Sequence, residues 1–189
     1  QTSNQPTAER HAIPATSAST EAQVGATSLR RVIAERMLAG SQQTAPVTLT
    51  AKCDVTNLVA FREQFKSAGE QFKLSVPGFT DLFIKLSAHA LVKHPALTHQ
   101  WTEAGIFVPE SIDIAVAIDT PAGLFAPVVR DVPGMQLADV SRKVRDSVDR
   151  AHSRQLKPEE LQNGVFTVSN LGRYRVDTFT PIINVPQTA

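Results

Sequence analysis

A strand and a tight turn near the middle of the chain constrain its fold more than any other feature. Ile112, Ile114, Val116 and Ile118 alternate with Asp113, Ala115 and Ala117. This period of two predicts a buried β-strand. Pro121–Gly123 predicts a turn into a second apolar run, Leu124–Val129. Part of the core is therefore expected to be a β-sheet.

Four segments show helical periodicity. The clearest places Leu137, Val140, Val144, Val148 and Ala151 on one face and charged residues on the other. A second helix is expected to start at Ser28, a possible N-cap, and a third near Thr56, followed by a loop over Ser67–Pro77. The fourth has an apolar face formed by Phe79, Leu82, Phe83, Leu86 and Ala90, and Pro95 stops it.

Further strands are expected between these helices. Val47–Val55 alternates apolar and polar residues, which predicts a half-buried strand. Glu103–Gly105 predicts a hairpin turn, and Val165–Val168 and Phe179–Ile183 are shorter candidate strands. Helices and strands do not alternate regularly, so an α+β fold is favoured over a doubly wound sheet.

Composition limits the function classes. The 189 residues are 42% hydrophobic and carry a net charge of +1, which gives no whole-surface field for nucleic acid or anionic membrane. No apolar run approaches membrane-spanning length, and Gln1–Thr27 lacks a signal-peptide pattern. With six Ala, five Thr, three Ser and two Pro, residues 1–27 predict a flexible linker. A lone cysteine forms no internal disulfide, which favours a reducing compartment.

Individual side chains point to little chemistry by themselves. No histidine pair has metal-ligand spacing supported by carboxylates or cysteines, so no metal site is expected. His89 is expected to be a hydrogen-bonded core histidine. Cys53, on the apolar side of a predicted strand, is expected to be a small buried hydrophobe rather than a nucleophile.

A set of ordered motifs carries a family resemblance. Ile114–Asp131 resembles the signature of the dihydrolipoamide acyltransferase (E2) catalytic domain of 2-oxoacid dehydrogenase complexes, G-I-A-V-x-T-x-x-G-L-x-x-P-V-I-R-D. Further segments resemble the family's first helix and strand, H-P-x-L-N-x-x-W, F-T-V-S-N-L-G and F-T-P-I-I-N-x-P. They are Arg30–Met37, Val47–Asp54, His94–Trp101, Val165–Gly172 and Phe179–Pro186. The resemblance covers residues 28–189, about the first two-thirds of the family's domain.

The resemblance implies a fold and a function. The fold would be like that of chloramphenicol acetyltransferase, a mixed sheet with helices packed on one face, here incomplete at the C-terminus. The activity would be acyl transfer between a dihydrolipoyl group on a partner lipoyl domain and coenzyme A, with acetyl, succinyl and branched-chain groups all open. Partners would be two further copies in a homotrimer that builds a larger core, and the E1 and E3 components. The location would be bacterial cytoplasm or mitochondrial matrix.

The resemblance assigns one catalytic residue. Ser169 matches the serine of F-T-V-S-N-L-G, which donates a hydrogen bond to the tetrahedral oxyanion. A strand-end hydroxyl that caps the Asn170–Gly172 turn is the structural alternative. The family's general base, the histidine of H-R-x-x-D-G, has no match in the 189 residues.

Three interpretations of the missing base motif follow. The chain is a partial sequence of an ordinary enzyme, which is favoured, a non-catalytic core or partner-binding subunit, or an acyltransferase of the chloramphenicol type. The 189 residues alone are expected to be catalytically silent and poorly soluble.

Overall fold

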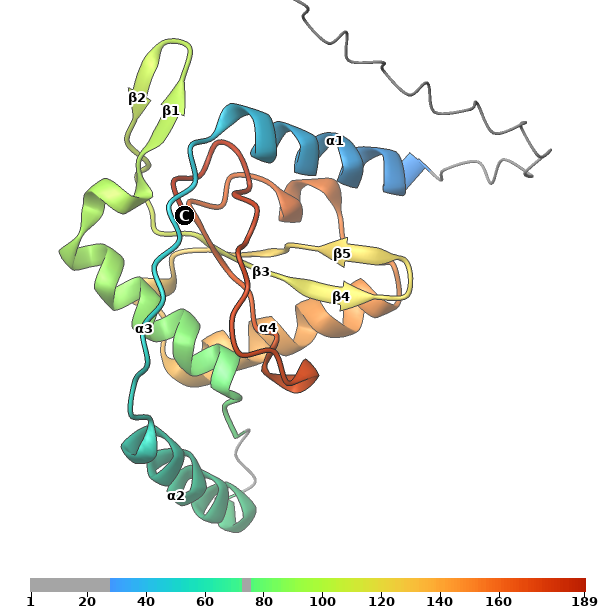
Figure 1. Ribbon diagram of the computed structural model, residues 1–189. Helices are drawn as coiled ribbons and strands as arrows, with labels where there is room; N and C mark the ends of the chain where they lie inside the picture. Colours follow the sequence, from blue (N-terminus) through green and yellow to red (C-terminus); the bar gives the residue numbers. More distant parts are fainter. Residues whose placement is uncertain (1–27, 73–75) are drawn as a thin grey trace, which may run out of the picture.

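The computed structural model describes residues 28–72 and 76–189 (Figure 1). Its α-helices are α1 (Ser28–Gln43), α2 (Thr56–Phe72), α3 (Phe79–Lys93) and α4 (Leu137–His152). Short 3-10 helices are η1 (Pro95–Thr98), η2 (Val132–Gly134), η3 (Pro158–Leu161) and η4 (Gly172–Tyr174). All four predicted helices are confirmed, although α2 continues through part of the predicted loop Ser67–Pro77. The linker predicted over residues 1–27 lies outside the described residues.

Short strands form three small sheets within the described residues. The strands are β1 (Gln100–Thr102), β2 (Gly105–Phe107), β3 (Ile114–Val116), β4 (Ile118–Thr120), β5 (Gly123–Phe125), β6 (Val128–Val129) and β7 (Phe166–Val168). β1–β2 and β4–β5 are antiparallel hairpins. In the third sheet the central β3 pairs antiparallel with β6 and parallel with β7. The predicted strand–turn–strand unit is confirmed in outline, but each of its two predicted strands is divided in the structure, into β3 and β4 and into β5 and β6. The α+β class is confirmed.

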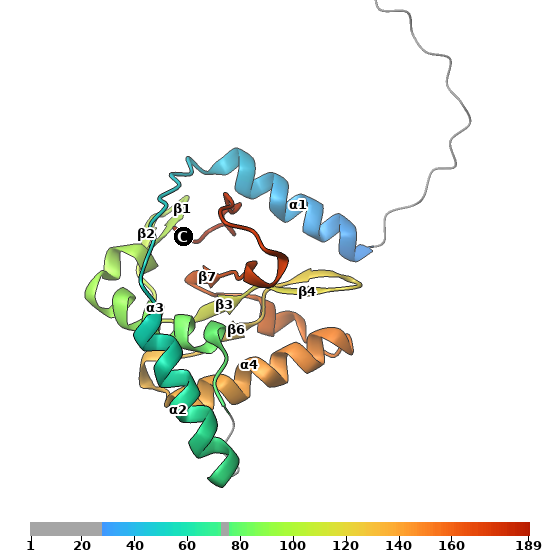
Figure 2. The ribbon, with the colours of Figure 1, turned by 60° about the horizontal axis from the view of Figure 1, so that its bottom comes forward.

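The core lies between this three-stranded sheet and two helices. Figure 2 shows α3 and α4 on one side of the strands and α1 on the other. The core side chains are aliphatic: Ile84, Ala88 and Leu91 from α3, Val140 and Val144 from α4, and Ile114, Val116, Val129 and Val132 from the sheet region. The predicted apolar face of α4 is therefore the face that packs.

The predicted apolar face of α3 is partly wrong. Phe79, Phe83 and Leu86 are exposed, whereas Ile84 is fully buried. Apolar residues occur on two sides of this helix, so the sequence pattern alone does not show which side meets the sheet. His89 is also exposed, and its predicted place in the core is wrong.

The strand predicted over Val47–Val55 is another correction. This segment pairs with no strand among the described residues, and Val47 and Leu49 are 84% and 91% exposed. Cys53 is exposed rather than buried. Alternation identifies two faces of an extended segment but does not supply the hydrogen-bonding neighbour that makes it a strand. Phe179–Ile183 likewise forms no strand.

Two cations attach loops to the core. Lys85 Nζ donates to the carbonyl oxygens of Val132, Pro133 and Met135 at 3.2, 2.9 and 2.6 Å. Its three N–H groups are thus matched by three acceptors, which fix α3 against η2. Arg130 pairs with the buried Asp113 carboxylate at 2.9 Å and also donates to the carbonyls of Glu159, Gln162 and Asn163.

Candidate active site

Ser169 comes directly after β7, at the carboxyl end of that strand. β7 and β3 run parallel with Val116 opposite Val168, and the Ala117 N–H donates to the Val168 carbonyl at 2.9 Å. The backbone leading into Ser169 is therefore fixed by the sheet. The Ser169 side chain itself is exposed, as a group that meets a substrate must be.

The neighbouring Asn170 closes the turn that follows. Its Oδ1 accepts from the Gly172 N–H at 2.9 Å, and its Nδ2 donates to Thr80 Oγ1 on α3 at 3.1 Å. A turn in which the side-chain oxygen of an asparagine accepts a hydrogen bond from the N–H two residues later is an Asx turn. The turn is therefore capped by Asn170, and the alternative role considered for the Ser169 hydroxyl is already filled.

Tyr174 forms a second attachment of the same loop. Its hydroxyl donates to Asp119 Oδ2 at 3.0 Å, and the Arg173 guanidinium lies 5.8 Å from the centre of its ring. The hydrogen bond to Asp119, together with the negative charge of that carboxylate, raises the pKa of Tyr174 above its ordinary value. The loop that begins at Ser169 is thus tied to α3 by Asn170 and to β4 by Tyr174.

The sequence indicated a turn at Asn170–Gly172, but it assigned no role to Asn170, Thr80, Tyr174 or Asp119. The Asx turn could have been predicted, because an asparagine two residues before a glycine is a turn signal. The contacts to Thr80 and Asp119 could not, since they join residues 90 and 55 positions apart along the chain.

The described histidines lie on elements other than the loop that carries Ser169. His89 lies nine residues beyond Thr80 on α3, which is about 13 Å along a helix that rises 1.5 Å per residue. His94 caps the end of α3, His99 follows η1, and His152 ends α4. The expectation that none of them belongs to the catalytic motif stays a prediction.

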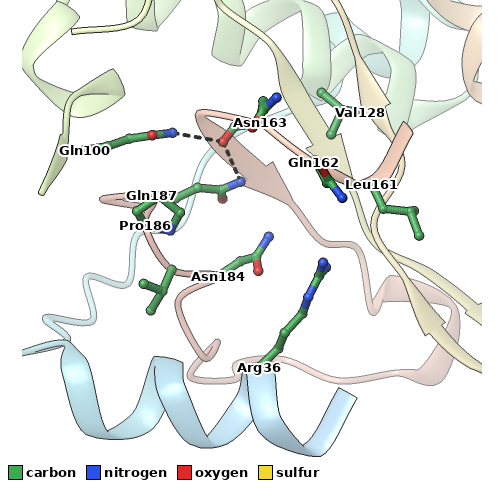
Figure 3. A pocket seen from close by; sticks show the side chains of 11 residues that line it. Arg36, Gln100, Val128, Leu161, Gln162, Asn163, Asn184, Pro186 and Gln187 are labelled. Carbon is green, nitrogen blue, oxygen red and sulfur yellow. Dashed lines mark hydrogen bonds between the residues drawn. The ribbon is translucent and has the colours of Figure 1, made fainter. Parts of the chain in front are cut away.

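A polar cavity of about 230 Å³ lies elsewhere, between α1 and the C-terminal segment (Figure 3). Arg36 points into it from α1, and the amides of Gln100 and Gln187 both donate to the Gly164 carbonyl, at 3.2 and 3.0 Å. Ser169 is not among the residues that line it. The cavity is therefore separate from Ser169.

In residues 28–72 and 76–189, no three His, Cys, Asp or Glu side chains are grouped so that they could hold a metal ion. None of the helices in these ranges is long and apolar enough to span a membrane.

Comparison with known families gives a direct match. Residues 18–189 match the family of 2-oxoacid dehydrogenases acyltransferase (catalytic domain). The chain belongs to this family. The resemblance first seen in the motifs is therefore confirmed.

Curated relatives from distant organisms are consistent with this family. The chain is 36% identical over 160 residues to the mitochondrial dihydrolipoyllysine-residue acetyltransferase component of the pyruvate dehydrogenase complex of Schizosaccharomyces pombe, covering 84% of the chain and 32% of that protein. The corresponding Dictyostelium discoideum protein is 37% identical, with 85% and 25% covered, and the Rickettsia felis protein is 32% identical, with 85% and 39% covered. The chain thus spans about a quarter to two-fifths of the length of these relatives.

Solved structures have the same fold. One was determined to study a serine, a histidine and an asparagine in the catalytic mechanism of Azotobacter vinelandii dihydrolipoamide acetyltransferase. It has a TM-score of 0.83 and 27% identity, covering 93% of this chain and 75% of that one. The cubic core of a pyruvate dehydrogenase multienzyme complex has a TM-score of 0.83 and 26% identity, with the same coverage. The predicted fold class, a mixed-sheet acyltransferase like chloramphenicol acetyltransferase, is confirmed.

Proposed function

We propose that this chain is part of a dihydrolipoamide acyltransferase, and that Ser169 donates a hydrogen bond to the oxyanion formed during acyl transfer. The observation that carries the proposal is the position of Ser169. It is exposed at the end of a sheet-anchored strand, in a loop whose own turn is capped by Asn170. Its hydroxyl is therefore not needed for the turn and is accessible to a substrate.

The chemistry needs one thiolate and one oxyanion donor. Coenzyme A loses its thiol proton to a base, and the thiolate attacks the carbonyl of the S-acyl dihydrolipoyl group. The tetrahedral oxyanion accepts a hydrogen bond from Ser169 Oγ. It then collapses, expels the dihydrolipoyl thiolate and leaves the acyl group on coenzyme A. The base returns its proton to the departing thiolate.

The proposal assigns no residue of this chain as the base. The five histidines of the chain lie outside any H-R-x-x-D-G motif, so the 189 residues alone are expected to be inactive. The acyl group is proposed to be acetyl, because the relatives compared above are acetyltransferase components.

The proposed organisation follows the family. Residues 1–27 would be a flexible linker, and residues 28–189 the N-terminal part of the catalytic domain. The domain would form a homotrimer within a larger core that receives lipoyl domains and works with the E1 and E3 components. Mitochondrial and bacterial relatives are both known, which supports a mitochondrial matrix or bacterial cytoplasmic location.

The test is acyl transfer between coenzyme A and dihydrolipoamide, measured with the full-length gene product. Ser169→Ala is expected to lower kcat about a hundredfold, as loss of one oxyanion donor typically does, with little change in KM. Ser153→Ala is the control, because Ser153 is an exposed serine at the end of α4 whose hydroxyl bonds the Asp149 carbonyl. A folded Ser169→Ala protein with unchanged kcat would exclude the assigned role. An assembled wild-type protein with no transfer would favour the alternative, a non-catalytic core subunit.

A further inference from the structure

The loop that carries Ser169 is held through its neighbours. Upstream, β7 is paired to β3, and the Val168 carbonyl accepts from Ala117. Downstream, the Asn170 side chain bonds Gly172 within the loop and Thr80 outside it. Because residues 168 and 170 flank Ser169 and are both attached, the backbone at Ser169 has little freedom to rotate.

We propose that Asn170 and Thr80 form a positioning pair, which fixes the Ser169 hydroxyl where the oxyanion develops. The inference rests on the proposed role of Ser169 and deepens it. Neither residue of the pair is assigned a contact with substrate. Asn170 acts by holding the peptide of Ser169, and Thr80 acts by holding the amide of Asn170.

The amide of Asn170 is suited to this task because it has a donor and an acceptor at one end of a short side chain. Its acceptor is used inside the loop, on the Gly172 N–H. Its donor is used outside the loop, on Thr80. Both bonds hold the same planar amide group, so a rotation of the Asn170 side chain would break at least one of them.

Thr80 is a firm anchor because α3 is itself held in the core. Ile84 is fully buried four residues further along the helix, and Lys85 bonds three carbonyl oxygens around η2. The pair therefore transmits the rigidity of the core to the turn beside Ser169. Precise placement matters, because a displacement of about 1 Å can reduce a rate on the order of a hundredfold.

Tyr174 supplies a second tether to the same loop. Its hydrogen bond to Asp119 attaches the far end of the turn to β4, which continues the strand paired with β7. Thr80 and Asp119 thus hold the loop from two different elements. Because Asn170 adjoins Ser169 directly, its loss is expected to displace Ser169 more than the loss of the Tyr174 contact does.

The kinetic test uses a matched set of variants of the full-length protein. Thr80→Val keeps the shape of the side chain and removes the acceptor for Asn170, and it is expected to lower kcat about tenfold or more with little change in KM. Thr80→Ser keeps the hydroxyl and should restore most of the rate. Thr102→Val is the control, since it removes a hydroxyl bonded to the Gly105 carbonyl at 2.8 Å in the β1–β2 hairpin.

A double variant shows whether Thr80 acts through Ser169. In a Ser169→Ala background, Thr80→Val should cost little further rate, because the group that it positions is already gone. An equal loss of rate in both backgrounds would overturn the proposal.

Hydrogen–deuterium exchange tests the tether without any need for activity. Two backbone N–H groups are protected from exchange by hydrogen bonds within the turn. The Gly172 N–H donates to Asn170 Oδ1, and the Tyr174 N–H donates to the Leu171 carbonyl. Their exchange should accelerate several-fold in Thr80→Val and remain near wild type in Thr80→Ser and Thr102→Val. Unchanged exchange in Thr80→Val would refute the positioning pair even if Ser169 proves catalytic. If exchange is faster in Thr80→Val but the wild-type protein is inactive, the tether is present and the proposed function is what fails.

Discussion

Arg150 joins the end of α4 to η3. Its guanidinium makes two bonds with Glu160, at 2.6 and 2.8 Å, and a third with Asp146 at 2.9 Å. Glu160 also accepts the Lys157 N–H at 2.8 Å. The hydrogen bond from Arg150, followed by that from Lys157, lowers the pKa of Glu160. The charged form of this one side chain therefore holds η3 on α4.

This arrangement predicts an acid-dependent contribution to stability. Because the pKa of Glu160 is lower in the folded state, its contribution is present above the unfolded pKa, about 4.3, and is lost as pH falls through the folded value. Glu160→Gln should reduce the free energy of unfolding by about 0.5–1 kcal/mol at pH 7, the range for a well-formed surface pair. The difference from wild type should shrink below about pH 4.

Denaturant unfolding of the full-length protein from pH 3 to 7 would measure this difference. Asp149→Asn is the control, because Asp149 is exposed on α4 and no side-chain ion pair is found for it in the described residues. A Glu160→Gln effect that is the same at pH 3 and pH 7 would contradict the assignment.

At the scale of elements, α3 is the helix on which core and candidate site both depend. One side packs on the sheet through Ile84, Ala88 and Leu91. Its first turn holds Asn170 through Thr80. A change in the seating of α3 would therefore reach both the stability of the domain and the loop of Ser169.

Substitutions on the two sides of α3 should differ clearly in how much unfolding free energy they cost. Ile84→Ala removes a fully buried side chain and should cost about 3–4 kcal/mol of unfolding free energy, as aliphatic truncations in close-packed cores do. Phe83→Ala removes a larger side chain that is exposed, and it should cost less than about 1 kcal/mol. Thermal and denaturant unfolding of both variants would decide. A larger loss for Phe83→Ala would mean that the other side of α3 faces the core.

The same helix shows how far sequence could predict this fold. The existence and approximate ends of α3 follow from its apolar content and from Pro95, and the helix is confirmed. Its packing side does not follow, because Phe83 and Ile84 are equally apolar. Likewise, alternation correctly placed β3 in the core but failed for Val47–Val55. A strand needs a neighbour, and pairing partners are set by tertiary structure rather than by the local pattern.

The candidate site, like the fold, could be predicted from the sequence only in part. Ser169 could be proposed from a seven-residue motif, because the motif carries family information. Thr80 and Asp119 could not, since neither belongs to the segment that contains Ser169. Only the folded chain brings α3 and β4 to the two ends of that loop.

At the scale of the whole molecule, apolar side chains remain exposed on two extended segments. Val47 and Leu49 lie on the segment that follows α1, which pairs with no strand among the described residues. Trp101 and Ile106 lie on the β1–β2 hairpin, which projects from the body in Figure 1. An extended segment with free N–H and C=O groups and apolar side chains is prone to pair with another strand. We therefore expect the Leu49 segment to become covered in the assembled protein.

Charge substitution at Leu49 would test this expectation. Burying a leucine side chain stabilises an assembly by about 2 kcal/mol, which corresponds to about thirtyfold in an association constant. Leu49→Glu should therefore shift the full-length protein toward smaller species by at least that factor in sedimentation experiments, or expose apolar surface that binds a hydrophobic dye. Lys143→Glu is the control, because it places the same side chain on the exposed polar face of α4, where it should leave the size distribution unchanged. If Leu49→Glu matches wild type in both size and unfolding free energy, the segment stays exposed in the assembled protein, and its apolar alternation has another cause.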